Sequence, residues 1–124
     1  MKYQSPSVGQ EISCVMKLVS SKFLLEPRAL KKILKQKLSE ENFGILKITS
    51  HTFEPHGFTL FFLLSESHLA IHTYPEYNSI YFNFYSCRGP ADAEPTFKFI
   101  KEKLKPKEIL FLRKDKVPLI NPQP

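Results

Sequence analysis

Apolar residues recur at every second position in several segments of the chain, which is the pattern of half-buried strands. In residues 11–19 these positions are Ile12, Cys14, Met16 and Leu18. Residues 45–53 read as a second strand. In residues 79–87, a face with Ile80, Phe82 and Phe84 alternates with a face carrying Tyr81, Asn83, Tyr85 and Cys87. Each of these segments is predicted to form a strand.

Two further segments are predicted to be strands from less regular apolar patterns. Residues 58–65 are almost wholly apolar and are predicted to form a central strand, whose pattern continues through Thr73 and breaks at Pro75. Residues 109–112 predict a short closing strand. Beyond it, the prolines predict an irregular tail: Pro118, Pro122 and Pro124.

Two segments instead repeat their apolar residues at helical spacing, and each begins at or near a proline, a residue suited to the first turn of a helix. The first begins at Pro27 and presents Leu30, Ile33, Leu34 and Leu38. The second begins at Glu94-Pro95 and presents Phe97, Ile100 and Leu104. The first helix is expected to end at residues 42–44, with Gly44 suited to a left-handed cap. Residues 54–57 read as a turn.

The order of these elements is strand, helix, several strands, helix, strand. No long crossover joins the middle strands, so they are predicted to be antiparallel. Two amphipathic helices packed on one face of that sheet give a two-layer α+β sandwich. At 124 residues, a single domain is the natural expectation.

The composition excludes several classes of protein. It is 42% hydrophobic and 13% aromatic, which is typical of a globular domain. No apolar run approaches the roughly 18 residues of a membrane-spanning helix, and the first residues lead into no signal-peptide core. These features predict a soluble, cytoplasmic protein. Cys14 and Cys87 fit no zinc-ligand spacing and are expected to stay reduced.

The net charge of +6 comes largely from lysines on the two predicted helices. One interpretation is a nucleic-acid footprint. The other, which we favour, is a solvated helix face, because the lysines alternate with apolar residues at helical spacing and form no arginine-rich tract. We therefore expect no nucleic-acid partner.

The most informative residues are Glu66-Ser67-His68, which place polar chemistry in an apolar strand pattern. Burying a polar group without a partner costs about 1–3 kcal/mol, so such residues are typical of a functional site. Ser67 and His72 suggest a nucleophile and a base. Residues five apart on a straight strand point to opposite faces, however, so either the chain bends near Ser67 or the partner comes from elsewhere, for instance a second subunit.

A metal site is not expected in this segment. His68 and His72 share a face, but their backbones would lie about 13 Å apart on a strand. No third ligand is apparent in the sequence.

The motifs around this segment resemble the bacterial and archaeal S-adenosylmethionine decarboxylase family. Members of that family carry E-S-H, then I-H-T-W-P-E, then T-C-G near the end of the next strand. The corresponding residues here are Glu66-Ser67-His68, Ile71-His72-Thr73-Tyr74-Pro75-Glu76 and Ser86-Cys87. Upstream, residues 53–59 are similar to the family's F-x-P-x-G-V-S. The spacing agrees over about residues 50–90.

The resemblance implies that the chain cleaves itself between Glu66 and Ser67, into an N-terminal β chain and a C-terminal α chain. The Ser67 hydroxyl attacks the preceding carbonyl to give an ester, and β-elimination then leaves Ser67 as a covalent pyruvoyl cofactor. That group forms a Schiff base with the substrate amine and acts as the electron sink for decarboxylation. The implied product is decarboxylated S-adenosylmethionine, an aminopropyl donor for spermidine synthesis.

The resemblance also assigns roles residue by residue. For processing, Glu66 flanks the cleaved bond, His72 acts as the base, and Thr59 stands where the family has a helping serine. For the substrate, Phe53 stacks on the adenine, Glu76 binds the ribose hydroxyls and Glu66 lines the pocket. Cys87 donates the proton after decarboxylation. The family's sites lie at the interface of a homodimer.

The sequence departs from the family at three places. In the first strand, the family pattern G-x-H-x-x-x-D lacks both its histidine, which is replaced by Glu11, and its aspartate. Tyr74 stands in place of a tryptophan, and Arg88 stands in place of the glycine after Cys87. Arg88 could alter the substrate pocket or point to solvent. Two alternatives therefore stay open: a pyruvoyl-dependent decarboxylase of arginine or ornithine, and an uncleaved, non-enzymatic paralogue that acts by dimerising with or regulating an active partner.

Overall fold

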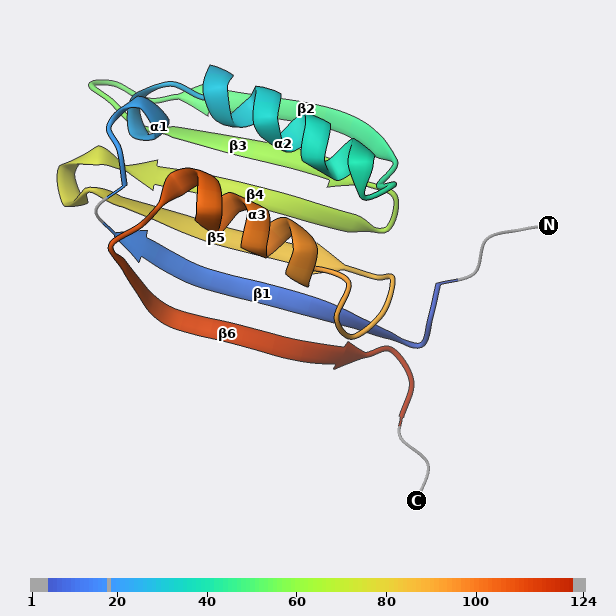
Figure 1. Ribbon diagram of the computed structural model, residues 1–124. Helices are drawn as coiled ribbons and strands as arrows, with labels where there is room; N and C mark the ends of the chain where they lie inside the picture. Colours follow the sequence, from blue (N-terminus) through green and yellow to red (C-terminus); the bar gives the residue numbers. More distant parts are fainter. Residues whose placement is uncertain (1–4, 18, 122–124) are drawn as a thin grey trace.

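Six strands form one sheet in the order β2-β3-β4-β5-β1-β6, and every neighbouring pair is antiparallel (Figure 1). This computed structural model describes residues 5–17 and 19–121. The strands are β1 Val8–Lys17, β2 Ile45–Thr52, β3 Phe58–Leu64, β4 Ser67–Tyr74, β5 Ser79–Ser86 and β6 Glu108–Pro118. The helices are α1 Lys22–Leu25, α2 Arg28–Glu40 and α3 Glu94–Leu104, with a 3-10 turn at Pro75–Tyr77.

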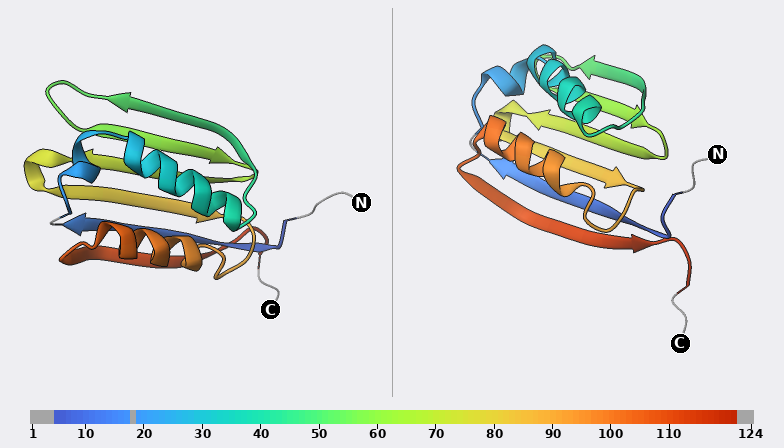
Figure 2. Two further views of the ribbon diagram at one scale, coloured as in Figure 1. Left: turned by 45° about the horizontal axis from the view of Figure 1, so that its top comes forward. Right: turned by 45° about the vertical axis from the view of Figure 1, so that its right-hand side comes forward.

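All three helices pack on the same face of the sheet, which confirms the predicted two-layer α+β sandwich (Figure 2). The helix α2 buries Leu30, Leu34 and Leu38, and α3 buries Phe97, Ile100 and Leu104. These stripes meet the sheet side chains Phe62, Phe82 and Phe84 in one hydrophobic core. Complete burial of each such side chain contributes about 1.5–3 kcal/mol, so this layer supplies most of the driving force for folding.

In the interior strands β3, β4 and β5, side chains alternate between the two faces of the sheet. In β4, Leu69, Ile71 and Thr73 are buried toward the helices, whereas His68 and His72 are half-buried on the opposite face. The opposite face also carries large apolar side chains from other strands: Phe61, Leu63, Tyr81 and Tyr85. Leu63 and Tyr81 are 42% and 38% exposed, so this open face presents aromatic and aliphatic surface to its surroundings.

Four local predictions differ from the structure. The apolar run from Phe58 does not continue to Thr73, because a two-residue turn at Ser65-Glu66 folds it into the β3–β4 hairpin. Since β3 lies next to the edge strand β2, residues 58–65 are interior to the sheet but not central. The left-handed residue after α2 is Asn42, with φ 63°, and not Gly44.

The closing strand is longer than predicted. It runs to Pro118 because β1 offers a partner along its whole length, from Val8 opposite Pro118 to Lys17 opposite Glu108. Leu18, Pro122 and Pro124 lie outside the described residues.

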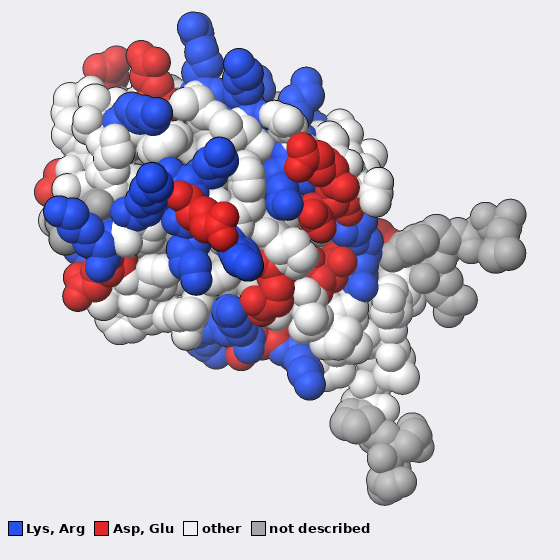
Figure 3. All heavy atoms as spheres, viewed as in Figure 1, with Lys and Arg blue, Asp and Glu red and all other residues white. Residues whose placement is uncertain are grey.

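Charged side chains cover the helical face without forming a single block (Figure 3). Lysine and arginine side chains alternate there with acidic and uncharged groups, as expected for a solvated helix face. Within residues 5–17 and 19–121, no helix is long and apolar enough to cross a membrane.

Candidate active site

Ser67 is the first residue of β4, directly after the turn that joins β3 to β4. Its side chain is 5% exposed, and its hydroxyl oxygen accepts a hydrogen bond of 3.0 Å from the backbone N–H of Cys87. The residue before it, Glu66, has φ 60°, in the left-handed region that costs a non-glycine residue about 1–3 kcal/mol. A buried serine hydroxyl is therefore held beside a peptide bond that follows a strained residue.

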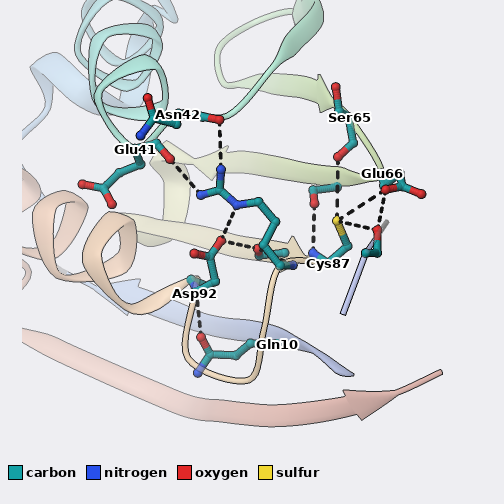
Figure 4. A network of polar contacts seen from close by, with 12 residues as sticks. Gln10, Glu41, Asn42, Ser65, Glu66, Cys87 and Asp92 are labelled. Atoms are coloured by element: carbon teal, nitrogen blue, oxygen red, sulfur yellow. Dashed lines mark hydrogen bonds and ion pairs between the residues drawn. The ribbon is translucent and has the colours of Figure 1, made fainter. Parts of the chain in front are cut away.

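The Cys87 thiol lies over the same turn (Figure 4). Its sulfur is 3.9 Å from the carbonyl oxygen of Ser65 and 4.0 Å from Oε1 of Glu66. The hydroxyl of Ser5 is 3.6 Å from this sulfur and donates a hydrogen bond to the same Glu66 carboxylate oxygen. Cys87 is 3% exposed, whereas Glu66 is exposed and Ser5 is half-buried, so a buried thiol lies at the inner side of a polar cluster that opens to solvent.

Tyr85 on β5 and Gly9 on β1 lie near this cluster. Burial raises the pKa of the Tyr85 phenol above its usual value, and negative charge on Cys87 and Glu66 raises it further. Gly9 lies against the end of β5, where an added Cβ would come 2.5 Å from the carbonyl oxygen of Ser86. A side chain at position 9 would therefore push β1 away from the strand that leads into Cys87.

The other predicted residues gather around a cavity of about 400 Å³ at the opposite end of β4. Its lining includes Phe53, Thr59, His72 and Glu76. The Thr59 hydroxyl is 2.8 Å from Nδ1 of His72, and these residues lie directly opposite each other on β3 and β4. Phe53 is 48% exposed and meets the ring of His51 edge-on at 4.7 Å, so much of its surface remains open to a ligand.

Glu76 lies in the 3-10 turn after β4, with its carboxylate 3.9 Å from Nδ1 of His56. Its side chain is about half exposed, so it can accept hydrogen bonds from a bound molecule. Tyr74, which stands where the family has tryptophan, lines the same cavity and is 44% exposed.

One protomer thus divides the predicted site residues into two groups, which we call half-sites. The junction half-site comprises Glu66, Ser67 and Cys87. The pocket half-site comprises Phe53, Thr59, His72 and Glu76. Ser67 and His72 lie five positions apart on an extended strand, a separation of about 16 Å, and their side chains lie on opposite faces of the sheet. The bend before Ser67 does not bring them together, so the nucleophile and the base do not meet within one chain.

The open face also carries a chain of polar side chains that was not predicted from the sequence. His68 Nε2 is 2.7 Å from Oδ1 of Asn83, and Asn83 Nδ2 donates to Glu11 Oε2 at 3.2 Å. The His68 ring also stacks on Phe61 at 5.8 Å. The carboxylate of Glu11 thus orients the amide of Asn83, which in turn holds the imidazole. Glu11 therefore has a polar partner although it replaces the family's histidine.

Ser5 and Arg88 were also not assigned to the site. Ser5 contacts the junction from 61 residues away, and no local pattern signals such a contact. Arg88 neither lines the cavity next to His72 nor points freely to solvent: its guanidinium binds backbone carbonyls at the end of α2. Among the described residues, no group of three or more histidine, cysteine, aspartate or glutamate side chains is arranged to hold a metal ion.

Comparison with known proteins gives a consistent result. The family model for S-adenosylmethionine decarboxylase matches residues 11–115. An S-adenosylmethionine decarboxylase proenzyme from Pyrobaculum arsenaticum is 35% identical over 103 residues, covering 82% of each chain. An S-adenosylmethionine decarboxylase proenzyme 2 from Bacillus anthracis is 42% identical over 65 residues, 52% of this chain and 53% of that one.

The fold is also shared with a solved structure. The adenosylmethionine decarboxylase from Aquifex aeolicus superposes with a TM-score of 0.83 at 22% identity, over 97% of this chain and 98% of that one. The family match spans both half-sites. The chain belongs to the S-adenosylmethionine decarboxylase family.

Proposed function

We propose that this protein is a self-processing decarboxylase that converts S-adenosylmethionine to decarboxylated S-adenosylmethionine, the aminopropyl donor for spermidine synthesis. The whole chain acts as one catalytic domain in the cytoplasm, where both free thiols stay reduced. The observation that carries the proposal is the buried Ser67 hydroxyl, held by the Cys87 N–H directly after the strained residue Glu66. The relatives to which this chain is similar are named as proenzymes, which supports a processing step.

Processing uses the chain's own residues. The Ser67 hydroxyl attacks the carbonyl carbon of Glu66, the C–N bond breaks, and the residues become joined by an ester while the Ser67 nitrogen becomes an amine. A base then removes the Cα proton of Ser67, and the Glu66 carboxylate leaves. The resulting dehydroalanine tautomerises and reacts with water, releasing ammonia and leaving a pyruvoyl group before His68. Left-handed backbone at Glu66 raises the energy of the starting turn relative to these products.

The surroundings of Ser67 suit that group. The Cys87 N–H that now bonds the hydroxyl oxygen can donate to a carbonyl oxygen at the same position. The Cys87 thiol, at the edge of the cluster, can return a proton to the substrate carbon after carbon dioxide leaves. The pyruvoyl group supplies the electron-accepting carbonyl for the decarboxylation.

A homodimer completes the site. Each protomer carries a nucleophile without a base at one end of β4 and a base without a nucleophile at the other. Pairing two copies through the open faces of their sheets would set the junction half-site of one against the pocket half-site of its partner. The half-buried and exposed side chains Phe61, Leu63 and Tyr81 favour such a contact, since burying them removes apolar surface from water.

The pocket half-site has the chemistry for a nucleoside. Phe53 offers an exposed aromatic face to a base, and Glu76 offers carboxylate oxygens to ribose hydroxyls. A volume of about 400 Å³ lies within the usual range for small-molecule sites. A small basic amino acid needs neither a stacking ring nor a ribose clamp, so these residues favour S-adenosylmethionine.

Mass spectrometry of the purified protein tests the processing step. We expect two fragments divided between Glu66 and Ser67, the second beginning with a pyruvoyl group, and an intact chain for Ser67→Ala. Release of labelled carbon dioxide from S-adenosylmethionine tests the substrate. Release of carbon dioxide from arginine or ornithine alone would show that the substrate is that amino acid and not S-adenosylmethionine. A wild-type chain that stays intact after prolonged incubation would contradict the proposal that the protein is a self-processing enzyme.

A further inference from the structure

The guanidinium of Arg88 donates to three acceptors of the chain around it. These acceptors belong to Glu41, Asn42 and Asp92, which are labelled in Figure 4. The Nε of Arg88 donates to Oδ2 of Asp92 at 2.8 Å, and its two terminal nitrogens donate to the carbonyl oxygens of Asn42 and Glu41 at 2.9 and 2.8 Å. Its central carbon lies 3.7 Å from the centre of the Phe43 ring. Every guanidinium nitrogen therefore has an acceptor while the flat face stacks on an aromatic ring.

The acceptors explain why an arginine suits this position. Glu41 and Asn42 follow directly after α2, where backbone carbonyls lack helical donors and carry partial negative charge. Phe43 is buried and packs against Phe84 of the core at 5.4 Å, so the ring cannot move away. Arginine alone combines a planar donor fork with a stacking face, and lysine would retain a single point of contact.

These contacts bear directly on Cys87. The Asp92 oxygen that binds Arg88 also accepts a hydrogen bond of 2.6 Å from the Ser86 hydroxyl, and the Arg88 N–H donates to that hydroxyl at 3.2 Å. The residues on both sides of Cys87 are thus tied to one carboxylate. Cys87 between them directs its N–H at Ser67 and its sulfur toward Glu66.

We propose that Arg88 is a positioning residue that holds Cys87 over the Glu66–Ser67 junction, before and after the bond is cleaved. This inference rests on the proposed function. The anchors at Glu41, Asn42 and Phe43 precede the cleaved bond, whereas Arg88 and Cys87 follow it. The clamp does not run through the Glu66–Ser67 peptide, so it persists when that bond breaks and the turn gains freedom. Arg88 stands where the family pattern given above has glycine, so the clamp depends on a departure of this chain from that pattern.

The test compares Arg88→Ala, Arg88→Lys and the control Arg113→Ala, an exposed arginine on β6. Two rates are measured: appearance of the two fragments after synthesis, and alkylation of Cys87 by iodoacetamide, mapped by peptide mass spectrometry. Cys14, which is buried in the core, serves as the internal reference for a thiol that stays protected. For Arg88→Ala we expect cleavage slowed and Cys87 alkylation accelerated, each by about 10- to 100-fold, because misplacement by about 1 Å has effects of that size. Arg88→Lys should fall between the alanine variant and the wild type.

A purely structural role would give a different pattern. Ile100→Val, which loosens the core under α3, provides a variant destabilised away from the junction. If it alters Cys87 alkylation as much as Arg88→Ala does at equal loss of thermal stability, the positioning role is overturned. It is also overturned if Arg88→Ala stays within about twofold of the wild type in both rates.

Failure of the proposed function can be told apart from failure of the Arg88 inference. If the wild-type chain never cleaves, the proposed function fails, but the alkylation rates still decide whether Arg88 holds Cys87. If Arg88→Ala does not fold, Arg88→Lys decides: an intermediate alkylation rate supports the clamp, and a wild-type rate overturns it.

Discussion

The hydroxyl of Thr59 lies 2.8 Å from Nδ1 of His72, across strands β3 and β4 that place the two residues directly opposite each other. Threonine keeps the hydroxyl of the serine expected from the family pattern, so the change leaves this contact possible. Because a hydrogen bond at one ring nitrogen fixes the orientation of the imidazole, the other nitrogen is left for proton transfer.

Removing this hydroxyl should slow processing. In Thr59→Val the side chain keeps its shape but loses the hydrogen bond, and we expect cleavage to slow by about tenfold, the equivalent of about 1.4 kcal/mol. Thr59→Ser retains the hydroxyl and should cleave close to the wild-type rate. A time course of fragment formation by mass spectrometry measures both. Equal cleavage rates for Thr59→Val and the wild type would contradict the role of the Thr59 hydroxyl in orienting His72.

The separation of the half-sites predicts complementation between two inactive chains. Ser67→Ala and His72→Ala, each expressed alone, should stay intact. Co-expressed, they form mixed dimers in which the intact Ser67 of one chain meets the intact His72 of the other. We expect cleavage of the His72→Ala chain only, detected by distinct affinity tags and mass spectrometry. Failure of the mixed sample to cleave, with mixed dimers present, would contradict a shared site.

Substrate binding should depend on Phe53 and Glu76 without affecting processing. Both line the cavity and lie far from Ser67 along the sheet. Loss of ring stacking in Phe53→Ala, or of the carboxylate in Glu76→Gln, should raise the KM for S-adenosylmethionine about tenfold. Steady-state carbon dioxide release measures KM, and the fraction of cleaved chain is scored in parallel. Tyr77→Ala is the control, because Tyr77 is an exposed aromatic outside the cavity lining. A loss of cleavage with unchanged KM would mean that these two residues act in processing and not in substrate binding.

The Glu94 carboxylate should make stability depend on pH. Its hydrogen bond from Lys114, at 2.8 Å, holds its pKa below the ordinary 4.5, with a further contribution from Gln10. A pKa lowered by folding adds stability above pH 4.5, and this is lost as the pH falls through the folded value. Because the ion pair is exposed, Glu94→Gln should cost less than about 1 kcal/mol at neutral pH.

Urea unfolding at several pH values tests this prediction. The free energies of unfolding of the wild type and Glu94→Gln should converge as the pH falls below 4.5, and their difference at neutral pH should shrink in high salt. Glu102→Gln, on the same helix, controls for the loss of a surface charge. A difference that does not change with pH would contradict the role of the Lys114 contact.

The local patterns of the sequence predicted the layers well but missed the turn at the centre of the site. Apolar periodicity identifies the buried stripes of α2 and α3 because each stripe depends on neighbours a few residues away. The turn at Ser65-Glu66 carries no glycine, asparagine or aspartate, the usual residues of a two-residue hairpin, so the apolar run appeared unbroken. The left-handed backbone at Glu66 departs from local preference directly before the bond proposed to break.

The contacts of Ser5 and Arg88 could not be predicted for a different reason. Apart from Asp92, four residues after Arg88, the hydrogen-bond partners of these two side chains lie 46 to 82 residues away, and the choice of partner depends on how the sheet brings distant segments together. Strand parity did separate Ser67 from His72, because alternation of faces follows from backbone geometry alone.

The strand order has a consequence for the fate of the cleaved protein. The proposed cleavage after Glu66 would leave β1, β2 and β3 on one fragment and β4, β5 and β6 on the other. In the sheet, β1 of the first fragment is inserted between β5 and β6 of the second, while β3 pairs with β4 across the break. Three of the five strand pairs therefore join the two fragments. Strands of the two fragments are interleaved in one sheet, so the fragments can separate only if that sheet unfolds. The cut exposes no new edge strand on which other chains could aggregate.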